Sequence, residues 1–273
     1  MKKFFLFGLV ISCLAVSAAR AQESTIVKGT LNAAETDRII KKVTENETNF
    51  RSALTNYVFN RSANVQTLGM GGQVTGAYRR DSFMTFTADG RRFERITFFP
   101  VSTLKEISVT PEDLEDLGGV NPFALEPASV PMYNFMYLGK EHIDELDLYV
   151  FEVTPKVIPD PKKTKQRLFS GRIWIDDRDL MIVKSKGKGL PETKDSKYPV
   201  VETWRENVDG KFWFPSYSSS DDEIVFDNGS VVKLRVRVKY ADYRQGRSDV
   251  KIIDDGNDVS EPKPSPTPAP KKP

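Results

Sequence analysis

Cysteine and histidine are almost absent from this sequence. Its 273 residues include one cysteine, Cys13, and one histidine, His142. A disulfide framework, a zinc site of the Cys/His type and a Cys–His nucleophile pair are therefore excluded, because each needs more of these side chains than the chain has. His142 falls near the end of a predicted strand, where an edge or turn position explains it without a catalytic role.

An excess of charge of one sign is also missing. The sequence has 40 lysines and arginines against 38 aspartates and glutamates. The formal charge of +2 becomes −1 when Lys2, Lys3 and Arg20 are removed with an N-terminal export signal, because that segment holds no acid. Such a chain has no global basic excess with which to recruit nucleic acid. Local basic clusters, which could meet an anionic headgroup or simply face solvent, are residues 156–167 and Lys233, Arg235, Arg237 and Lys239.

Catalytic motifs are scarce as well. The sequence contains no phosphate loop, nucleophile elbow or dinucleotide-binding fingerprint. Residues 218–222 (three serines and two aspartates) and the aspartates around Asp176 and Asp179 fall between predicted strands, where these residue types favour turns. The acidic residues at 254–258 lack the spacing of a calcium loop. We therefore predict a protein that is not an enzyme, with no catalytic residue, metal or cofactor, and rank a hydrolase third.

The N-terminus has the pattern of an export signal. Lysines precede an apolar stretch over residues 4–19, and Ala19-Arg20-Ala21 supplies the small-x-small motif that a signal peptidase cleaves. We predict a cleaved signal peptide over residues 1–21 and a periplasmic protein. The alternative is a lipid anchor at Cys13, because Val10-Ile11-Ser12-Cys13 has the order of a lipoprotein box. Against it, the apolar stretch continues past Cys13 to the better cleavage site.

The C-terminus is predicted to be a disordered, proline-rich tail over residues 254–273. Proline occupies alternate positions from Pro262 to Pro270, and no apolar periodicity is present. Such a segment cannot bury enough apolar surface to offset the entropy lost on ordering. The intervening residues, 22–253, are long enough for one sizeable domain.

Two helical segments are predicted within this domain. The first begins after Asn32, which can cap it with Glu35 three residues on. Its apolar residues that share one face are Ile39, Val43, Phe50 and Leu54. The second is a short helix that Thr110-Pro111 opens inside an insertion over residues 101–131. This insertion could serve as a lid.

Antiparallel strands account for most of the rest. Asp89-Gly90, Asp209-Gly210 and Asn228-Gly229 are strong signals for turns between paired strands. In the last strand, apolar and basic residues alternate from Val232 to Tyr240, so one face must be buried. The predicted fold class is mainly β (α+β): a curved antiparallel sheet of about nine to eleven strands with an N-terminal helix and a short helical insertion.

Four successive segments carry a family resemblance: Gly171-Arg172-Ile173-Trp174-Ile175-Asp176, Leu180-Met181-Ile182-Val183-Lys184, Val201-Glu202-Thr203-Trp204-Arg205-Glu206 and Lys211-Phe212-Trp213-Phe214-Pro215. They resemble a bacterial branch of the outer-membrane lipoprotein-sorting superfamily, which includes LolA-like and LolB-like carriers and RseB-like stress regulators. The resemblance implies an unclosed β-barrel whose concave apolar face holds the acyl chains of a lipid or lipoprotein.

We therefore predict a non-catalytic periplasmic carrier or binding protein for a hydrophobic ligand. Its expected partner is a lipid or an acylated protein, with contact at the outer-membrane surface. The alternative is an envelope protein-interaction or stress-sensing module, whose barrel is filled by its own side chains and whose partner is an envelope protein. The tryptophans, Trp174 included, could line a cavity or belong to the core. The predicted wall of an apolar cavity is Ile224, Phe226, Val232, Leu234, Val236, Val238, Tyr240, Trp204 and Trp213.

Overall fold

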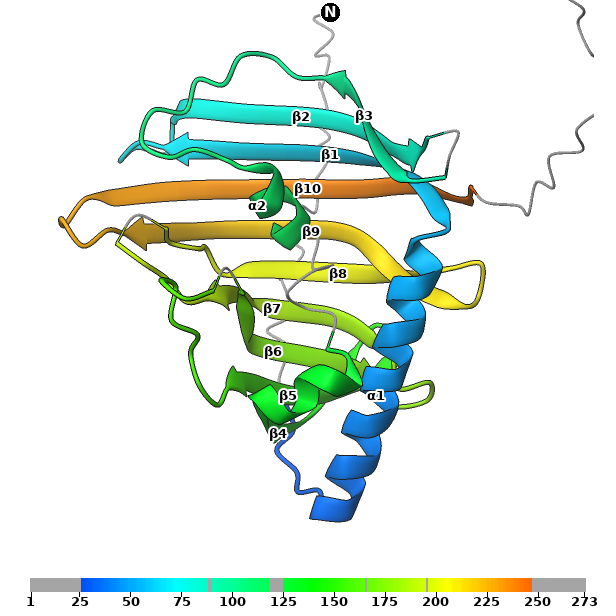
Figure 1. Ribbon diagram of the computed structural model, residues 1–273. Helices are drawn as coiled ribbons and strands as arrows, with labels where there is room; N and C mark the ends of the chain where they lie inside the picture. The colour runs from blue at the N-terminus through cyan, green and yellow to red at the C-terminus, as the bar shows by residue number, and fades with distance from the viewer. Residues whose placement is uncertain (1–25, 88–89, 118–124, 165, 195, 247–273) are drawn as a thin grey trace, which may run out of the picture.

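The chain forms one ten-stranded antiparallel sheet (Figure 1). The computed structural model describes residues 26–87, 90–117, 125–164, 166–194 and 196–246. The strand order is β3-β2-β1-β10-β9-β8-β7-β6-β5-β4. Consecutive strands are therefore adjacent except β3 and β4, which lie at opposite edges, and β1 pairs with β10 in the middle of the sheet. Within the described residues the two edge strands, β3 and β4, do not pair with each other. The predicted unclosed, mainly β fold is confirmed, and its ten strands fall within the predicted number.

The strands are of unequal length, and the longest lie in the middle of the sheet. Their bounds are β1 Tyr57–Leu68, β2 Val74–Phe86, β3 Arg92–Phe98, β4 Tyr133–Ile143, β5 Leu146–Pro155, β6 Leu168–Asp176, β7 Ile182–Leu190, β8 Val201–Val208, β9 Phe212–Val225 and β10 Val231–Gln245.

Among the described residues, three helical segments lie on one face of the sheet, here called the inner face (Figure 1). The first, α1, spans Ala33–Leu54, and Asn32 caps it as predicted, because the Glu35 amide donates to Asn32 Oδ1 at 2.8 Å. The second, α2, spans Pro111–Leu117 in the predicted insertion, and η1 is a 3₁₀ segment over Pro127–Met132. No helix among the described residues is long and apolar enough to cross a membrane.

Two apolar clusters fill most of the space between α1 and the sheet. The first joins Ile39 and Val43 of α1 to Phe151 and Ile173 on β5 and β6. The second joins the C-terminal half of α1 to β1, β9 and β10, with Phe50, Leu54, Phe214, Val238 and Tyr240 among its members. The predicted apolar stripe of the helix is therefore the face that packs on the sheet.

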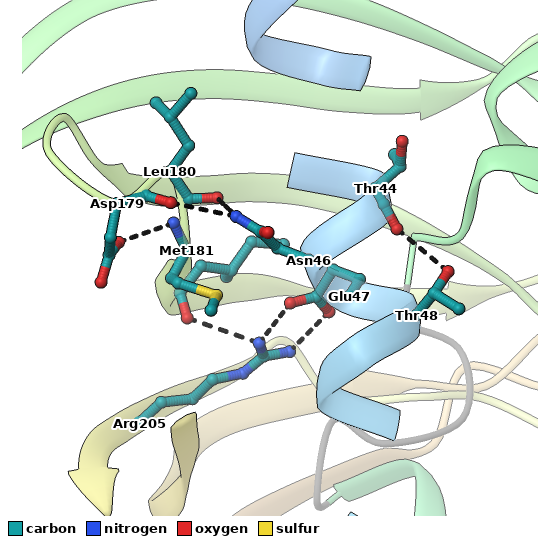
Figure 2. Close-up of polar contacts among 9 residues, drawn as sticks. Thr44, Asn46, Glu47, Thr48, Asp179, Leu180, Met181 and Arg205 are labelled. Atoms are coloured by element: carbon teal, nitrogen blue, oxygen red, sulfur yellow. Dashed lines mark hydrogen bonds and ion pairs between the residues drawn. The ribbon is translucent and has the colours of Figure 1, made fainter. Parts of the chain in front are cut away.

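A buried ion pair fixes α1 to the middle of the sheet (Figure 2). The Arg205 guanidinium on β8 donates to both carboxylate oxygens of Glu47, at 2.6 and 3.0 Å, and its carbon lies 4.3 Å from the centre of the Phe50 ring. One residue earlier, the Asn46 amide donates to the carbonyls of Asp179 and Leu180, at 3.0 Å each, in the β6–β7 turn. Charge-assisted bidentate hydrogen bonds give the helix one defined position on the sheet.

The opposite, outer face carries a stack of aromatic rings and a lysine. The Lys184 ammonium lies between the rings of Trp174 and Trp204, at 4.7 and 4.3 Å from their centres. Both indole N–H groups donate to carboxylates, Trp174 to Glu141 at 2.6 Å and Trp204 to Glu202 at 2.9 Å. Cation–π contacts of this kind compensate a buried lysine ammonium for the hydration that it has lost. These tryptophans are part of the packing of the outer face.

Several predictions concern residues outside this description. The predicted signal peptide at 1–21, Cys13 within it and the predicted tail at 254–273 all lie outside the described residues, as does Asp89 of the β2–β3 turn. Of the other predicted turns, Asp209-Gly210 joins β8 to β9 with positive φ at both residues, 55° and 66°, as that turn type requires.

Candidate ligand pocket

A pocket of about 320 Å³ lies on the inner face, beside the end of the sheet where the loops β7–β8 and β9–β10 meet. Strands β1, β9 and β10 form its apolar floor, residues of β7 and β8 also line it, and two loops and the start of α2 form its walls. The residues that line it are Val65, Glu106, Ile107, Ser108, Val109, Thr110, Asp113, Arg167, Gly187, Lys188, Gly189, Ser196, Lys197, Tyr198, Pro199, Val201, Ile224, Phe226, Leu234 and Val236.

The floor is apolar because of the period-two pattern of β10. Leu234 and Val236 point to the inner face, while the basic residues that alternate with them point outward. Val65 lies opposite Val236 on β1, and Ile224 lies opposite Val232 on β9. Strand pairing thus gathers the apolar side chains of three strands into one surface.

The walls come from segments without regular structure. Ile107 and Val109 stand on the loop that leads into α2, and Ile107 also packs against the cluster of Ile224 and Leu234. On the opposite side, the loop before β8 brings Tyr198 to the pocket, where the Arg167 guanidinium lies 4.8 Å from its ring centre. Both walls therefore present an apolar surface toward the floor.

Glu106 lines the pocket, and each lysine or arginine that lines it has an acidic partner. Arg167 contacts Asp113 of α2 at 3.3 Å, and Lys188 contacts Glu192 at 2.9 Å. The third cation, Lys197, contacts Asp227 at 2.8 Å, and this hydrogen bond raises the pKa of the Lys197 ammonium. Because each cation has an acidic partner, the rim is polar without a strong field of one sign. An apolar floor with a polar rim suits the tail of an amphiphile.

Four of the predicted cavity residues line this pocket: Ile224, Phe226, Leu234 and Val236. Val232 packs beside them in the cluster of Ile224 and Leu234. Val238 and Tyr240 lie farther along the inner face of β10, where α1 covers them. The structure thus brings together five of the seven residues predicted between Ile224 and Tyr240 and places the other two in the core.

Trp204 and Trp213 are not brought to the pocket. On β8, the residues on either side of Trp204 face inward, because Thr203 hydrogen-bonds Ser218 at 2.9 Å and Arg205 reaches Glu47 on α1. Trp204 must therefore point to the outer face. Trp213 likewise packs with the outer cluster, and its indole N–H donates to Asp179 Oδ2 at 3.0 Å.

The sequence indicated one wall of the pocket but not the other. The insertion 101–131, which we expected to serve as a lid, supplies Ile107, Val109 and Asp113. The loop with Tyr198 and Pro199, and Val65 on β1, were not anticipated. The loop with Tyr198 and Pro199 has no periodic pattern that would indicate which of its side chains are buried. Val65 reaches the pocket only because β1 pairs with β10, which is distant in sequence.

The serines and the histidine that a hydrolase could use do not lie close together. Ser218 is buried and hydrogen-bonded to Thr203 on the inner face of β9. His142 lies on β4, five strands away in the sheet, where its Nδ1 is 2.9 Å from Asp147 Oδ1. A nucleophile and its base must lie within hydrogen-bonding reach. Among the described residues, these serines and the histidine do not form such a pair.

Comparison with known proteins gives matches at the level of structure only. No protein-family model matches the sequence, and neither does any curated protein. A DUF1329 family protein from Desulfovibrio piger matches with 16% identity over 79% of this chain and 95% of that chain, with a TM-score of 0.34. MucB in complex with MucA, from Pseudomonas aeruginosa, matches with 8% identity over 78% and 100% of the two chains, with a TM-score of 0.23.

A further structure of MucB matches with 12% identity, over 77% of this chain and 93% of that chain, and a TM-score of 0.28. The identities and TM-scores are low, and these matches transfer neither a ligand nor a partner to this chain.

Proposed function

We propose that this protein is a non-catalytic periplasmic binding protein that holds one hydrophobic chain, from a lipid or an acylated protein, in the inner-face pocket. The observation that supports this most is the apolar floor of Val65, Leu234, Val236 and Ile224 beneath a polar rim. The proposal includes the predicted division into an export signal at 1–21, a domain at 22–253 and a tail at 254–273.

The size of the pocket supports one chain in preference to a whole phospholipid. Its volume of about 320 Å³ lies at the lower end of the roughly 300–1,000 Å³ typical of ligand pockets. Side chains of α1 and of the insertion fill most of the rest of the inner face, and the Glu47–Arg205 ion pair holds α1 there, so a larger cavity would require α1 to move. Burial contributes roughly 0.8 kcal/mol per methylene, so about eight methylenes would contribute roughly 6 kcal/mol before entropic costs.

A fluorescent fatty acid, whose emission rises in an apolar environment, tests the proposal. Ile107→Trp adds bulk to the wall of the pocket, and we expect it to raise the Kd of the probe by about tenfold or more. The matched control is Val225→Trp, which adds the same bulk to an exposed position on β9 outside the pocket. The control should keep the wild-type Kd within about twofold. Equal probe binding by both variants would contradict a pocket at this position.

The second candidate function is an envelope protein-interaction module. It is favoured by the packed core beneath α1, since Phe50, Phe151 and Phe214 are all fully buried. The two candidates are distinguished by protein purified from a bacterial periplasm. Native mass spectrometry should find bound lipid or acylated peptide if the pocket is a carrier site, and a ligand-free protein would favour the interaction module.

A further inference from the structure

The two edge strands of the sheet differ in whether another segment pairs with their outer side. At the β4 edge, Val27 adds an isolated antiparallel bridge, with hydrogen bonds of 2.7 and 3.0 Å to the backbone of Lys140. At the other edge, β3 pairs with β2 only, and no described segment pairs with its second side. An unpaired strand exposes a row of backbone N–H and C=O groups that can receive another strand.

The β3 edge is also unusually apolar for an exposed strand. Phe93, Ile96, Phe98 and Phe99 are each between 45 and 50% exposed, and Val101 just beyond them is 92% exposed. Edge strands of monomeric proteins are normally protected by lysine, proline, bulges or short length. Strand β3 is short, with 7 residues and a register shift between Ile96 and Phe98, but it contains no lysine and no proline. Here large apolar side chains project on both faces of the sheet beside the free backbone groups. This arrangement is typical of a surface that another chain covers.

Arginines give this edge a positive charge. Strands β2 and β3 together contain four arginines and two carboxylates. Asp81 is paired with Arg79, and Glu94 is paired with Arg61 and Arg80. Of the remaining two, Arg92 stacks on the Phe59 and Phe86 rings and donates to the Tyr57 carbonyl, so it points back toward β1. Arg95 stacks on the Phe83 ring and has no carboxylate partner among the described residues. A carboxylate of the partner would complement Arg95.

We propose that the β3 edge binds an extended segment of a partner protein as an eleventh strand, and that this segment alternates acidic and apolar side chains. Main-chain hydrogen bonds would give affinity, and the exposed phenylalanines and Arg95 would select the side chains. A lipid surface fits this edge less well, because inserting it would carry unpaired backbone groups into an apolar medium at several kcal/mol each. The site is separate from the pocket, whose floor lies on β1, β9 and β10.

The register of the β2–β3 hairpin identifies which amides face the partner. The Thr87 amide donates to the Arg91 carbonyl at 2.9 Å, so hydrogen-bonded and non-hydrogen-bonded pairs alternate from that point. Glu94 and Ile96 occupy non-hydrogen-bonded pairs with β2, and their N–H groups therefore point to the free edge. Proline at position 96 would remove one of these donors without removing a bond to β2.

The test is fluorescence anisotropy with a labelled ten-residue peptide of alternating glutamate and valine. We expect saturable binding to the wild-type protein and about tenfold or more weaker binding to Arg95→Glu, which reverses the charge at an exposed position. Ile96→Pro should weaken binding by a similar factor relative to Ile96→Ala, which loses the side chain but keeps the amide. Circular dichroism verifies that each variant is folded.

Three outcomes would overturn the proposal. If a peptide with lysine in place of glutamate binds equally well, the edge does not select its partner by charge. Sedimentation with anionic phosphatidylglycerol vesicles, in the absence of peptide binding, would assign the edge to a membrane. Concentration-dependent dimerisation that Ile96→Pro abolishes would assign it to a second copy of this chain. The Ile107→Trp variant should bind the peptide with wild-type affinity, so failure of the pocket and failure of this edge are distinguishable.

Discussion

At the scale of single residues, the buried pair of Glu47 and Arg205 carries the clearest consequence. Their side chains are 1% and 4% exposed. Taking both charges out of water is costly, and the bidentate geometry offsets that cost only while both partners are present. The sequence around Arg205 does not indicate that its side chain is buried, because a charged residue in an alternating strand is normally expected to face solvent.

We predict that Arg205→Met lowers the free energy of unfolding by about 3–5 kcal/mol, because it leaves the Glu47 carboxylate buried without a partner. Urea denaturation followed by tryptophan fluorescence measures this. The double variant Glu47→Leu/Arg205→Met removes both charges and should recover most of the loss. If the double variant is as unstable as Arg205→Met, the cost arises from packing and not from the unpaired charge.

A second residue-scale prediction concerns Glu94 on β3. Burial raises the pKa of its carboxyl, but hydrogen bonds from Ser82 and Arg80 and the charge of Arg61 outweigh burial, so the pKa lies below its ordinary value. The carboxylate therefore stabilises the fold above the unfolded pKa of about 4.3, and this contribution is lost as the pH falls through the lower folded pKa.

Unfolding free energies of the wild type and Glu94→Gln, measured from pH 7 to pH 3, test this account. The wild type should be the more stable at pH 7, and the difference should shrink as the carboxylate is protonated. Glu145→Gln, in the exposed β4–β5 turn, is the control and should follow the wild-type curve. A difference between wild type and Glu94→Gln that stays constant with pH would contradict the assignment.

At the scale of elements, α2 is held over the pocket by the buried Leu114 and by the polar contacts of Asp113. Asp113 Oδ2 accepts from the Thr110 amide at 2.9 Å, and its Oδ1 accepts from Arg167 at 3.3 Å. The Asp113 amide in turn donates to Thr110 Oγ1 at 3.1 Å. Asp113 therefore caps its own helix and also ties that helix to the residue that precedes β6.

We predict that Asp113→Ala loosens this tie and raises the Kd of the fatty-acid probe by about two- to fivefold, while the fold remains intact. Hydrogen exchange should become faster in residues 107–114 and stay unchanged in β4 and β5. Lys188→Ala, which breaks only an ion pair at the rim, is the matched control and should leave the exchange of this segment unaltered. Unchanged exchange in Asp113→Ala would show that packing alone holds α2.

The elements that the sequence predicts best are those with local signals. The Asn32 cap, the helix at Pro111 and the turns at Asp209-Gly210 and Asn228-Gly229 depend on residues a few positions apart. The pairing of β1 with β10 joins residues far apart in sequence and has no local signal. Trp204 faces outward because the polar Thr203 and Arg205 occupy the inner positions, so the hydrophobic pattern of β8 is inverted relative to the usual rule.

At the scale of the whole molecule, the open sheet offers two separate surfaces. The inner face combines a core packed under α1 with a pocket at the loop end, and the β3 edge offers an unpaired strand. A ligand in the pocket and a partner at the edge would contact different strands. The loop that follows β3, which carries Ile107 and Val109, is the one described segment that leads from the edge to the pocket wall.

The most direct test of the binding function is cross-linking with a photoactivatable fatty acid, followed by mass spectrometry of the labelled peptides. The account predicts saturable labelling of residues 106–110 and of the peptides that contain Phe226 and Leu234, and competition by unlabelled fatty acid. Labelling confined to the outer face around Trp204, or spread without saturation over the whole chain, would contradict a ligand site between α2 and β10.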